Sequence, residues 1–348
     1  MGWENRMKAL VKYKEGPGNV EIRDIEIPSV EDHEILIKTR SAGFCGTDLE
    51  IYRWDFKTTI PVIMGHEGAG EVVEVGRAVT GVKIGDRVAL ETSKIICGTC
   101  DYCRMGRYNL CSVRKGMGYG TDGTFAEYIK TNGGRVHRIS KKIPFEEAGI
   151  LETLSVATRA VIQVANVKGG DTVLVSGPGP IGLLVVQVVK AVGASKVIVA
   201  GRKSKNRLEL SKELGATSAF SGQDDVVGAV KEITNGKGAD LFFECSGNAH
   251  AFKDLLPAVK KGGQVILVGL YPEEIPFGLN TIVTNELEVK GTWTSGVFTD
   301  WTRTIALVEA GQVKMTPLIS HRFPLEGWEE IVNLMERGAC IKAIFTMG

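Results

Sequence analysis

The sequence lacks an apolar run long enough to cross a bilayer, and its first residues, MGWENRMKAL, lack the apolar core of a secretory signal peptide. Neither sign of charge is in excess, because 42 basic residues stand against 41 acidic ones and leave a formal charge of +1. Such a chain has no general field that attracts nucleic acid or an anionic membrane. We expect a cytoplasmic protein with a small-molecule partner, bound neither to a membrane nor to nucleic acid.

The cysteines lack the even number and wide spread of a disulfide framework. There are seven of them, and four fall between Cys97 and Cys111. In a reducing compartment, clustered cysteines more often bind a metal. Glycine, in contrast, is abundant at 43 residues and recurs at the ends of apolar runs, which indicates many tight turns.

The order of apolar runs divides the 348 residues into three segments. Residues 1–152 hold alternating runs such as ILIKTRSAG and GEVVEVG, which predict a β-rich domain. Residues 153–291 alternate strands with helices, from DTVLVSG and PIGLLVVQVVKAVGA to AHAFKDLLPAVKKGG and QVILVGL. This order predicts parallel βαβ units and hence a doubly wound nucleotide-binding domain. We expect residues 292–348 to return to the first domain, so that the chain is an α/β protein of two domains.

A glycine-rich turn, GPGPIG, follows the strand TVLVSG and opens the next helix. Its GxGxxG spacing suits a dinucleotide, because Gly177 permits the tight turn, Gly179 lets the backbone approach a pyrophosphate, and Gly182 lets the helix pack on the strand. The helix N-terminus offers N–H groups to the phosphates. The alternative is a plain strand–helix turn. The expected cofactor contacts are Gly177, Gly179, Pro180, Ile181 and Gly182 and, after later strands, Ser246, Val268 and Gly269.

The next strand, KVIVAG, ends 19 positions after Gly182, where nucleotide-binding domains often place an acidic residue. This chain has Gly201, Arg202 and Lys203 there, with Arg207 close behind. A carboxylate would bind the ribose hydroxyls of NAD and repel the extra phosphate of NADP, whereas an arginine pairs with that phosphate through two hydrogen bonds. We predict that NADP is preferred and that NAD is the alternative. The competing interpretation is an ordinary solvated basic loop.

The segment CGTCDYCRMGRYNLC has the spacing C-x2-C-x2-C-x7-C. Four thiolates at this spacing close a tetrahedral zinc site with no open position, which makes the site structural. An iron–sulfur cluster uses similar cysteine runs but normally adds a nearby proline or a second motif, and four free thiols in one loop would be open to oxidation. We predict a structural zinc held by Cys97, Cys100, Cys103 and Cys111.

Two shorter segments, SAGFCGTDLE and PVIMGHEGAG, carry further metal-binding residue types. Cysteine, histidine and carboxylate side chains all suit zinc, and three protein ligands leave a position for water or substrate, as a catalytic site requires. Each residue alone would more often be structural, as a buried cysteine or a hydrogen-bonded histidine. Together, Cys45, His66 and Glu67, each beside a glycine, predict a catalytic metal site.

These motifs, GHEGAGEVVEVG, CGTD, the four-cysteine segment and GPGPIG, resemble those of the zinc-dependent medium-chain alcohol dehydrogenases nearly end to end. The stretches CGTDLEIY, LETLSVATRA and LISHRFPLEGWEEI are most similar to the polyol (sorbitol-type) and threonine dehydrogenase branch. The resemblance implies a GroES-like catalytic domain, a Rossmann domain, an active site in the cleft between them, and a homotetramer or dimer. It assigns Cys45, His66 and Glu67 to a catalytic zinc, which Glu152 approaches directly or through a water molecule. It assigns Thr47 to the substrate hydroxyl and the proton relay.

Two positions depart from that family. Glu50 stands where a histidine often passes the proton to solvent, and Ser93 replaces the histidine in the ETH triplet of threonine dehydrogenases. Both departures count against threonine as the substrate. We expect zinc-dependent hydride transfer between NADP, or NAD, and a secondary alcohol, polyol or sugar. Glu50 carries the proton if its pKa is raised, and otherwise the relay takes another route. The alternatives are a threonine dehydrogenase-like enzyme that oxidises a β-hydroxy amino acid, and a non-catalytic cofactor-binding relative, which would be expected to have lost zinc ligands.

Overall fold

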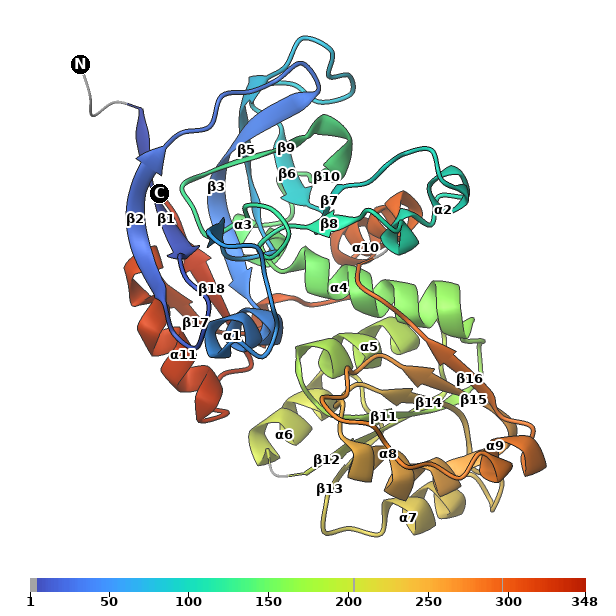
Figure 1. Ribbon diagram of the computed structural model, residues 1–348. Coiled ribbons are helices and arrows are strands. Elements are labelled where there is room, and N and C mark those ends of the chain that lie inside the picture. Colours follow the sequence, from blue (N-terminus) through green and yellow to red (C-terminus); the bar gives the residue numbers. More distant parts are fainter. Residues whose placement is uncertain (1–4, 203, 296) are drawn as a thin grey trace. The chain divides into compact units, whose positions relative to one another are not determined.

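The computed structural model describes residues 5–202, 204–295 and 297–348, and the chain divides into two compact units (Figure 1). The first, here called the N-terminal unit, holds the residues up to Thr153 together with Ser295–Ile305 and Met315–Gly348. The second, the central unit, holds Leu154–Thr294 and Ala306–Lys314. Most of the C-terminal segment therefore folds with the first half of the chain, while residues 306–314 fold with the second.

The N-terminal unit is built on a seven-stranded sheet in the order β10-β6-β5-β3-β18-β17, with β9 also paired to β3. β3 is antiparallel to both β5 and β18, and its side chains Ile35, Ile37 and Ala42 are fully buried. A three-stranded sheet, β2-β1-β4, and the small β7-β8 pair complete the unit. Its strands are β1 Arg6–Lys12, β2 Val20–Glu26, β3 Glu34–Phe44, β4 Val62–Ile63, β5 Ala69–Val75, β6 Arg87–Leu90, β7 Ser93–Ile95, β8 Lys115–Gly116, β9 Tyr128–Asn132, β10 Val136–Arg138, β17 Ile319–Phe323 and β18 Lys342–Thr346.

Aromatic rings fill the core of this unit beside β3. The Phe44 ring stacks on Phe125 at 5.6 Å, and Phe345 meets Phe125 edge-on at 4.8 Å. The Tyr52 ring packs against Trp328. The helices are α1 Gly46–Arg53, α2 Asp101–Arg104, α3 Phe145–Ala148 and α11 Trp328–Glu336, and two more, α4 Leu151–Thr158 and α10 Phe298–Glu309, contribute residues to both units.

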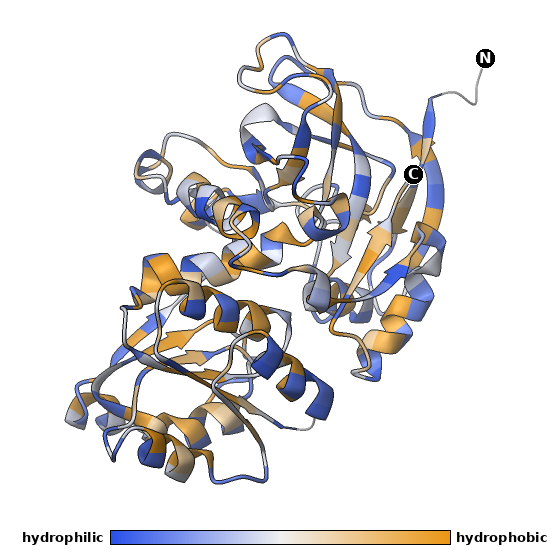
Figure 2. Cartoon of the chain, turned by 180° about the vertical axis from the view of Figure 1, so that it is seen from behind, coloured by the Kyte–Doolittle hydropathy of each residue, from blue (hydrophilic) through white to orange (hydrophobic). Residues whose placement is uncertain are grey.

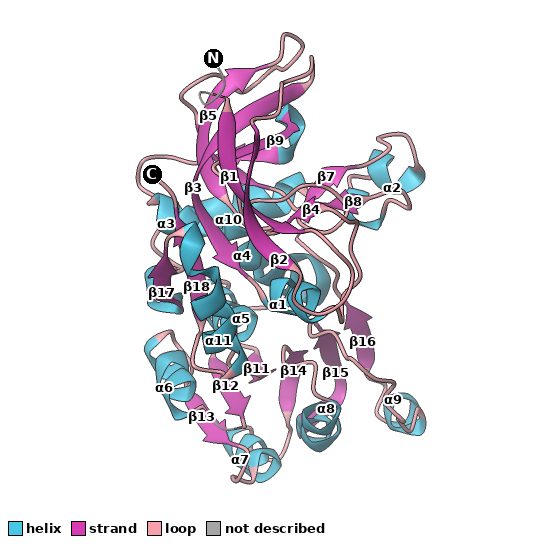
Figure 3. Ribbon diagram, turned by 60° about the vertical axis from the view of Figure 1, so that its left-hand side comes forward, coloured by secondary structure: helices cyan, strands magenta, loops and turns pink. Residues whose placement is uncertain are grey.

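The central unit is a six-stranded parallel sheet in the order β13-β12-β11-β14-β15-β16. Numbered from its own first strand, this order is 3-2-1-4-5-6, the Rossmann arrangement. Figures 1 and 3 show α5 over one face of the sheet and α7 and α8 over the other, and Figure 2 shows the hydrophobic strands between them. The elements are β11 Thr172–Ser176, α5 Pro180–Ala191, β12 Lys196–Gly201, α6 Lys205–Glu213, β13 Ser218–Ser221, α7 Val226–Ile233, β14 Ala239–Glu244, α8 Ala249–Leu255, β15 Val259–Leu267, α9 Asn280–Thr284 and β16 Glu288–Gly291, with a π-helix, Arg159–Ala165, ahead of β11.

The strands of the central sheet are buried on both faces. Val173, Leu174 and Val175 of β11 are all fully buried, because helices cover the sheet from both sides. The loops at the carboxyl ends of β11, β12 and β14 are therefore held by a rigid framework, and this edge is where such sheets bind ligands. Among the described residues, no helix combines the length and the hydropathy needed to span a membrane.

Candidate functional site

Cys45 lies at the N-cap of α1, directly after β3. The Asp48 side chain, three residues later, accepts a hydrogen bond from the Cys45 backbone N–H at 2.8 Å and fixes the start of the helix as in a capping box. The other Asp48 oxygen faces Nδ1 of His66 at 3.4 Å. One buried carboxylate thus orients two predicted metal ligands. Sequence reasoning gave Asp48 no role, although an acidic residue three positions after an N-cap is the signal for it.

Cys45, His66 and Glu67 converge in the N-terminal unit. The Cys45 sulfur, a ring nitrogen of His66 and a carboxylate oxygen of Glu67 all lie within 4.8 Å of one another. Glu67 Oε1 accepts a hydrogen bond from Lys342 Nζ at 2.6 Å, while its Oε2 is buried without a hydrogen-bond partner among the described residues. A side chain at Gly43 would place its Cβ 2.3 Å from that Oε2, so the glycine makes room for the carboxylate. A thiol, an imidazole and an orphaned carboxylate oxygen at this spacing fit a zinc ion.

The acidic side chains around Cys45, His66 and Glu67 stabilise positive charge in this buried place. Burial lowers the pKa of His66, but the charges of Asp48 and Cys45 raise it well above its ordinary value. Burial likewise lowers the pKa of Lys342, and Glu67 and Cys45 raise it further than burial lowers it, so the ammonium stays charged. For both His66 and Lys342 the protonated, positively charged form is stabilised, because several acidic side chains lie close together in one buried place.

Glu152, the fourth expected ligand, lies beside this group but is not part of it. It is buried in α4, and its Oε1 accepts a hydrogen bond from Thr92 Oγ1 at 2.8 Å. The same Thr92 hydroxyl lies 3.3 Å from the backbone oxygen of His66. Burial and the nearby charge of Glu67 raise the pKa of Glu152. Thr92, which sequence reasoning did not single out, therefore links Glu152 to the His66 loop.

Thr47 and Glu50 both lie on α1, and three residues of separation place them on the same face of the helix. Thr47 is half-buried, whereas Glu50 is exposed. Although Glu50 is exposed as a residue, the protein atoms around its carboxyl exclude part of the solvent, and this desolvation and the charge of Asp55 raise the pKa of that carboxyl. A carboxyl whose pKa lies above its ordinary value exchanges protons more readily near neutral pH, as a proton carrier must.

The four clustered cysteines lie in a lobe formed by residues 93–116. Sulfur atoms of Cys97 and Cys103 are 3.9 Å apart, and those of Cys97 and Cys111 are 3.6 Å apart. A tetrahedral tetrathiolate with Zn–S bonds of about 2.3 Å has sulfur–sulfur edges of about 3.8 Å. Backbone N–H groups of Cys100 and Thr99 lower the pKa of Cys97 to about 6. The four side chains fit a structural zinc, with Cys100 as the fourth member.

Hydrogen bonds tie this lobe to the neighbourhood of Glu152. The Tyr108 hydroxyl donates to Glu91 Oε1 at 2.6 Å, and His137 Nε2 lies 2.8 Å from the same oxygen. Arg135 approaches the other Glu91 oxygen at 3.3 Å. Glu91 is buried and immediately precedes Thr92, whose hydroxyl bonds Glu152. The lobe and the Cys45–His66–Glu67 group are therefore connected through contiguous buried polar contacts.

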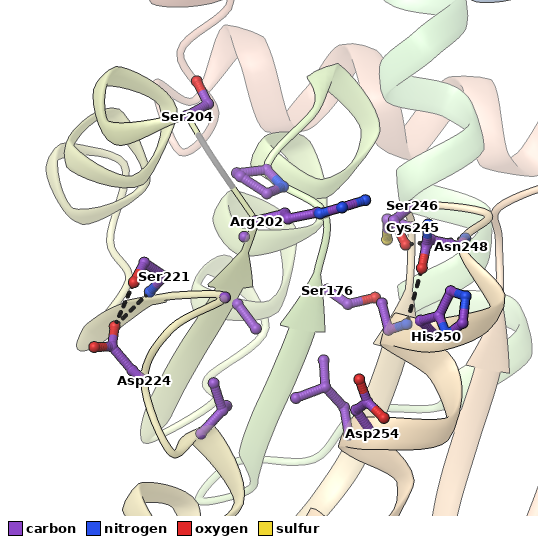
Figure 4. A pocket seen from close by; sticks show the side chains of 18 of the residues that line it. Ser176, Arg202, Ser204, Ser221, Asp224, Cys245, Ser246, Asn248, His250 and Asp254 are labelled. Carbon is purple, nitrogen blue, oxygen red and sulfur yellow. Dashed lines mark hydrogen bonds between the residues drawn. The ribbon is translucent and has the colours of Figure 1, made fainter.

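The central unit contains a cavity of about 1020 Å³ at the carboxyl ends of β11, β12 and β14 (Figure 4). Figure 4 shows the Arg202 side chain extending across it toward the loop that carries Ser246 and Asn248. Ser204, the N-cap residue of α6, also lines it and was not anticipated. The cavity lining includes the expected residues Gly177, Gly179, Gly201, Arg202, Arg207 and Ser246, but not Pro180, Ile181, Gly182, Val268 or Gly269, and Lys203 lies outside the described residues.

Each glycine of the GPGPIG turn meets different surroundings. Gly177 has a φ of +82°, and a Cβ there would lie 2.8 Å from the Ser246 Cβ. A Cβ at Gly182 would lie 2.1 Å from the Gly177 carbonyl oxygen, so the close packing of helix on turn requires glycine. A Cβ at Gly179 would meet no protein atom within 4 Å. The folded chain therefore needs Gly177 and Gly182, while Gly179 borders open space in the cavity.

Replacing Gly179 with alanine separates ligand binding from folding. We expect the variant to change the free energy of unfolding by less than about 1 kcal/mol, since the added methyl touches nothing. Its dinucleotide affinity should fall by about 10-fold or more, because the methyl group occupies the approach path of the pyrophosphate. Thermal unfolding without ligand and a fluorescence titration with dinucleotide measure the two effects. Gly182→Ala is the matched control and should lose stability instead, and an unchanged affinity in Gly179→Ala would contradict this role.

Glu244, at the end of β14, accepts hydrogen bonds from several segments at the base of the cavity. Its buried carboxylate accepts hydrogen bonds from the Ser176 hydroxyl at 2.9 Å, the Gly247 N–H at 3.0 Å and the Tyr271 hydroxyl at 2.8 Å. The Ser246 N–H also donates to it at 2.9 Å. Because these donors come from three separate segments, the loop that carries Ser246 is fixed in place before any ligand arrives.

Two family models match the chain. The model for zinc-binding dehydrogenases covers residues 180–310, and the model for the alcohol dehydrogenase GroES-like domain covers residues 31–141. The sorbitol dehydrogenase of Halalkalibacterium halodurans is 37% identical over 342 residues, which are 98% of this chain and 99% of that protein. The chain belongs to the zinc-dependent medium-chain alcohol dehydrogenase family. This confirms the resemblance carried by the GHEGAGEVVEVG, CGTD and GPGPIG motifs.

Other members of the medium-chain alcohol dehydrogenase family match as completely. The L-threonine 3-dehydrogenase of Pyrococcus horikoshii is 38% identical over 349 residues, 98% of this chain and 99% of that protein. A zinc-binding dehydrogenase from Sinorhizobium meliloti 1021, solved with bound NADP, has a TM-score of 0.91 and 31% identity, and the match covers 99% of this chain and 100% of that one. The expected fold, a GroES-like domain with a Rossmann domain, is confirmed. The chain is a zinc-dependent, NAD(P)-dependent dehydrogenase that acts on alcohol groups.

Proposed function

We propose that this dehydrogenase oxidises a secondary alcohol group of a polyol or sugar with NADP as the preferred acceptor. The observation that carries the proposal is the Cys45–His66–Glu67 group. Lys342 holds Glu67 through Oε1, Glu67 Oε2 has no hydrogen-bond partner among the described residues, and Asp48 faces the histidine ring. The sorbitol dehydrogenase relative supports the substrate class. Arg202 in the cavity, together with the NADP found in the Sinorhizobium meliloti structure, supports the acceptor.

In this proposal the chain's own residues hold the ion and move the proton. Cys45, His66 and Glu67 would hold a zinc ion, with Glu152 beside them. Zinc in such a site supplies a Lewis acid that lowers the pKa of an alcohol, and a bound nicotinamide accepts the hydride. Thr47 Oγ1 takes the hydroxyl proton from the substrate and passes it along α1 to the Glu50 carboxylate, which releases it to solvent. The raised pKa of Glu50 supports its place as the terminal carrier.

The second candidate is oxidation of a β-hydroxy amino acid. The Pyrococcus horikoshii threonine dehydrogenase, at 38% identity, favours it. The residues at Glu50 and Ser93 count against it, and the Ser93 hydroxyl is already engaged, since it accepts a hydrogen bond from Arg114 Nε at 2.7 Å. Initial rates with NADP and with NAD on secondary alcohols, polyols, aldoses and threonine separate the candidates. Turnover of polyols or sugars with NADP supports the proposal, and turnover of threonine alone with NAD overturns it.

Replacing Arg202 with alanine tests the acceptor. We expect the Kd for NADP to rise about 10- to 100-fold, which is the loss of one charge-assisted contact to phosphate, and the Kd for NAD to change by less than about 3-fold. Titration of both dinucleotides against the same protein measures the difference. Lys212→Ala, an exposed cation on α6 paired with Glu209, is the control and should leave both affinities unchanged. Equal losses for NADP and NAD would show that Arg202 does not contact the phosphate.

We also propose a homo-oligomer that pairs through the central unit. β16 is the edge strand of the six-stranded sheet. Leu279 immediately precedes α9, Val283 lies within it, and Leu270 lies between β15 and α9; these residues are 68%, 71% and 61% exposed. An edge strand flanked by exposed apolar side chains suits a second copy related by a two-fold axis. Val283→Asp should shift the molar mass measured by light scattering to that of a smaller assembly, whereas Ile84→Asp, an exposed apolar position in the N-terminal unit, should not. A monomeric parent protein would contradict the proposal.

The cysteines support a cytoplasmic location, which we propose as the compartment of this enzyme. None of the seven, all of which lie among the described residues, forms a disulfide, and four of them form the zinc-binding lobe. Clustered thiols persist in a reducing compartment, where they bind metal instead of forming disulfides. Fractionation of the source cells with an antibody to the protein tests the location.

A further inference from the structure

Gly201 lies at the end of β12, at the position where an acidic residue would select the unphosphorylated ribose. Its backbone has an ordinary conformation, so no positive φ requires glycine there. Position 201 is restricted instead by the side-chain atoms that surround it. A Cβ at Gly201 would lie 2.8 Å from both Cγ and Cδ of Pro178 and 3.1 Å from Cδ2 of Leu208. Distances under about 3 Å between carbon atoms are strongly repulsive, so something must move before any side chain fits.

The two neighbours differ in how easily they give way. The Leu208 side chain can rotate about its side-chain bonds, which moves Cδ2 away. The Pro178 ring cannot, because it closes on its own backbone and follows the backbone wherever that is held. The backbone is held, since the Gly177 N–H donates to the Ala200 carbonyl at 2.9 Å and ties the glycine turn to β12. Pro178 itself is buried.

We propose that Pro178 is a cofactor-specificity residue that excludes any side chain at position 201, so that the preference for a phosphorylated ribose is set by two residues together. The second position of the glycine turn fills the space that a ribose-binding carboxylate needs. With that space filled, the end of β12 presents only backbone, and Arg202 and Ser204 supply the side chains that meet the ribose end of the ligand. The inference rests on the proposed use of NADP.

A set of six proteins tests this: the parent, Gly201→Asp, Gly201→Ala, Pro178→Ala, and the two double variants that combine Pro178→Ala with each substitution at 201. For Gly201→Ala, which adds a Cβ without charge, we expect a Tm lower than that of the parent by about 4 °C or more without ligand, from overpacking. Pro178→Ala should restore most of that loss in the Pro178→Ala/Gly201→Ala protein. If Gly201→Ala keeps the parent Tm, or if Pro178→Ala restores nothing, the steric pair does not exist.

The ligand readout uses the ratio of kcat/KM for NAD to that for NADP. Gly201→Asp alone should lose NADP without gaining NAD, because its carboxylate cannot enter the site. The double variant Pro178→Ala/Gly201→Asp should show a ratio at least about 10-fold higher than Gly201→Asp alone, as expected for one new charge-assisted contact to the ribose. Equal ratios in these two proteins would overturn the role of Pro178. The parent's own ratio reports separately on the proposed NADP preference, so a parent that prefers NAD would refute that preference while the Tm comparison still decides the steric pair.

Discussion

Replacing Cys45 with alanine will reduce kcat/KM by about 10³-fold or more while the protein remains folded. The thiolate is one of three side chains whose ligand atoms lie within 4.8 Å of one another, and its removal leaves His66 and Glu67 as an incomplete zinc site. Lewis-acid stabilisation of a developing alkoxide is worth several kcal/mol, and about 4 kcal/mol corresponds to about 10³ in rate. Initial rates under the conditions that support the parent enzyme measure the loss.

Two further measurements test whether the loss of activity in Cys45→Ala comes from the loss of the catalytic zinc. The variant should contain one zinc per chain instead of two, because the lobe at Cys97–Cys111 keeps its own four thiols. Its affinity for NADP should be unchanged, because the cavity that contains Arg202 belongs to the central unit. Cys340→Ala is the matched control, since this buried thiol belongs to neither metal group. A Cys45→Ala protein that keeps its activity would remove the catalytic zinc from Cys45.

In the zinc-free protein, replacing Lys342 with methionine will destabilise the N-terminal unit by on the order of 3 to 5 kcal/mol, because it leaves the Glu67 carboxylate buried without its lysine partner. Lys342 and Glu67 are 3% and 1% exposed, and their charged atoms are 2.6 Å apart. The pKa of Lys342 is raised, so its contribution is complete below about 10.4, the pKa of an unfolded lysine, and is lost only as the pH rises through the higher folded value. Denaturant unfolding at neutral pH therefore measures the whole effect.

An exposed ion pair of similar length provides the comparison for Lys342. Lys8 and Glu326 are 2.7 Å apart, but their side chains are 50% and 53% exposed. Lys8→Met should cost less than about 1 kcal/mol. The double variant Glu67→Gln/Lys342→Met should recover most of the stability that Lys342→Met loses, because neither charge is then left unpaired. If Lys342→Met and Lys8→Met lose equal stability, burial does not govern the Glu67–Lys342 pair.

The features that sequence reasoning predicted well are those encoded in short stretches. β12 spans Lys196–Gly201 as expected, because an apolar strand that ends in glycine is a local signal. The four cysteines of the lobe lie so close along the chain that their convergence requires only tight turns. The different environments of Gly177, Gly179 and Gly182 also follow from the spacing of one motif, since that spacing fixes which glycine faces strand, cavity and helix.

Contacts between distant segments were not accessible in the same way. Glu67 and Lys342 are 275 positions apart, and nothing near Lys342 in the sequence indicates that it meets a zinc-site carboxylate. The helix predicted for AHAFKDLLPAVKKGG was wrong in its second half. α8 ends at Leu255, two residues before Pro257, and residues from Val259 onward join β15. At these residues, hydrogen-bonded pairing with β14 outweighs the helix propensity of Lys260 and Lys261. Similarly, β13 was not recognised because its residues are only half-buried.

The hydrogen bond between Tyr108 of the four-cysteine lobe and Glu91 couples the state of the lobe to the surroundings of Glu152. Cys97 is exposed, and its pKa, lowered to about 6, favours the thiolate, which is the form that oxidants attack. Disorder in the lobe would remove the hydrogen bond that Tyr108 donates to Glu91, the neighbour of Thr92, whose hydroxyl donates to Glu152. We therefore expect oxidation of the lobe to disturb the surroundings of Glu152 through Glu91 and Thr92, although none of these three residues is itself oxidised.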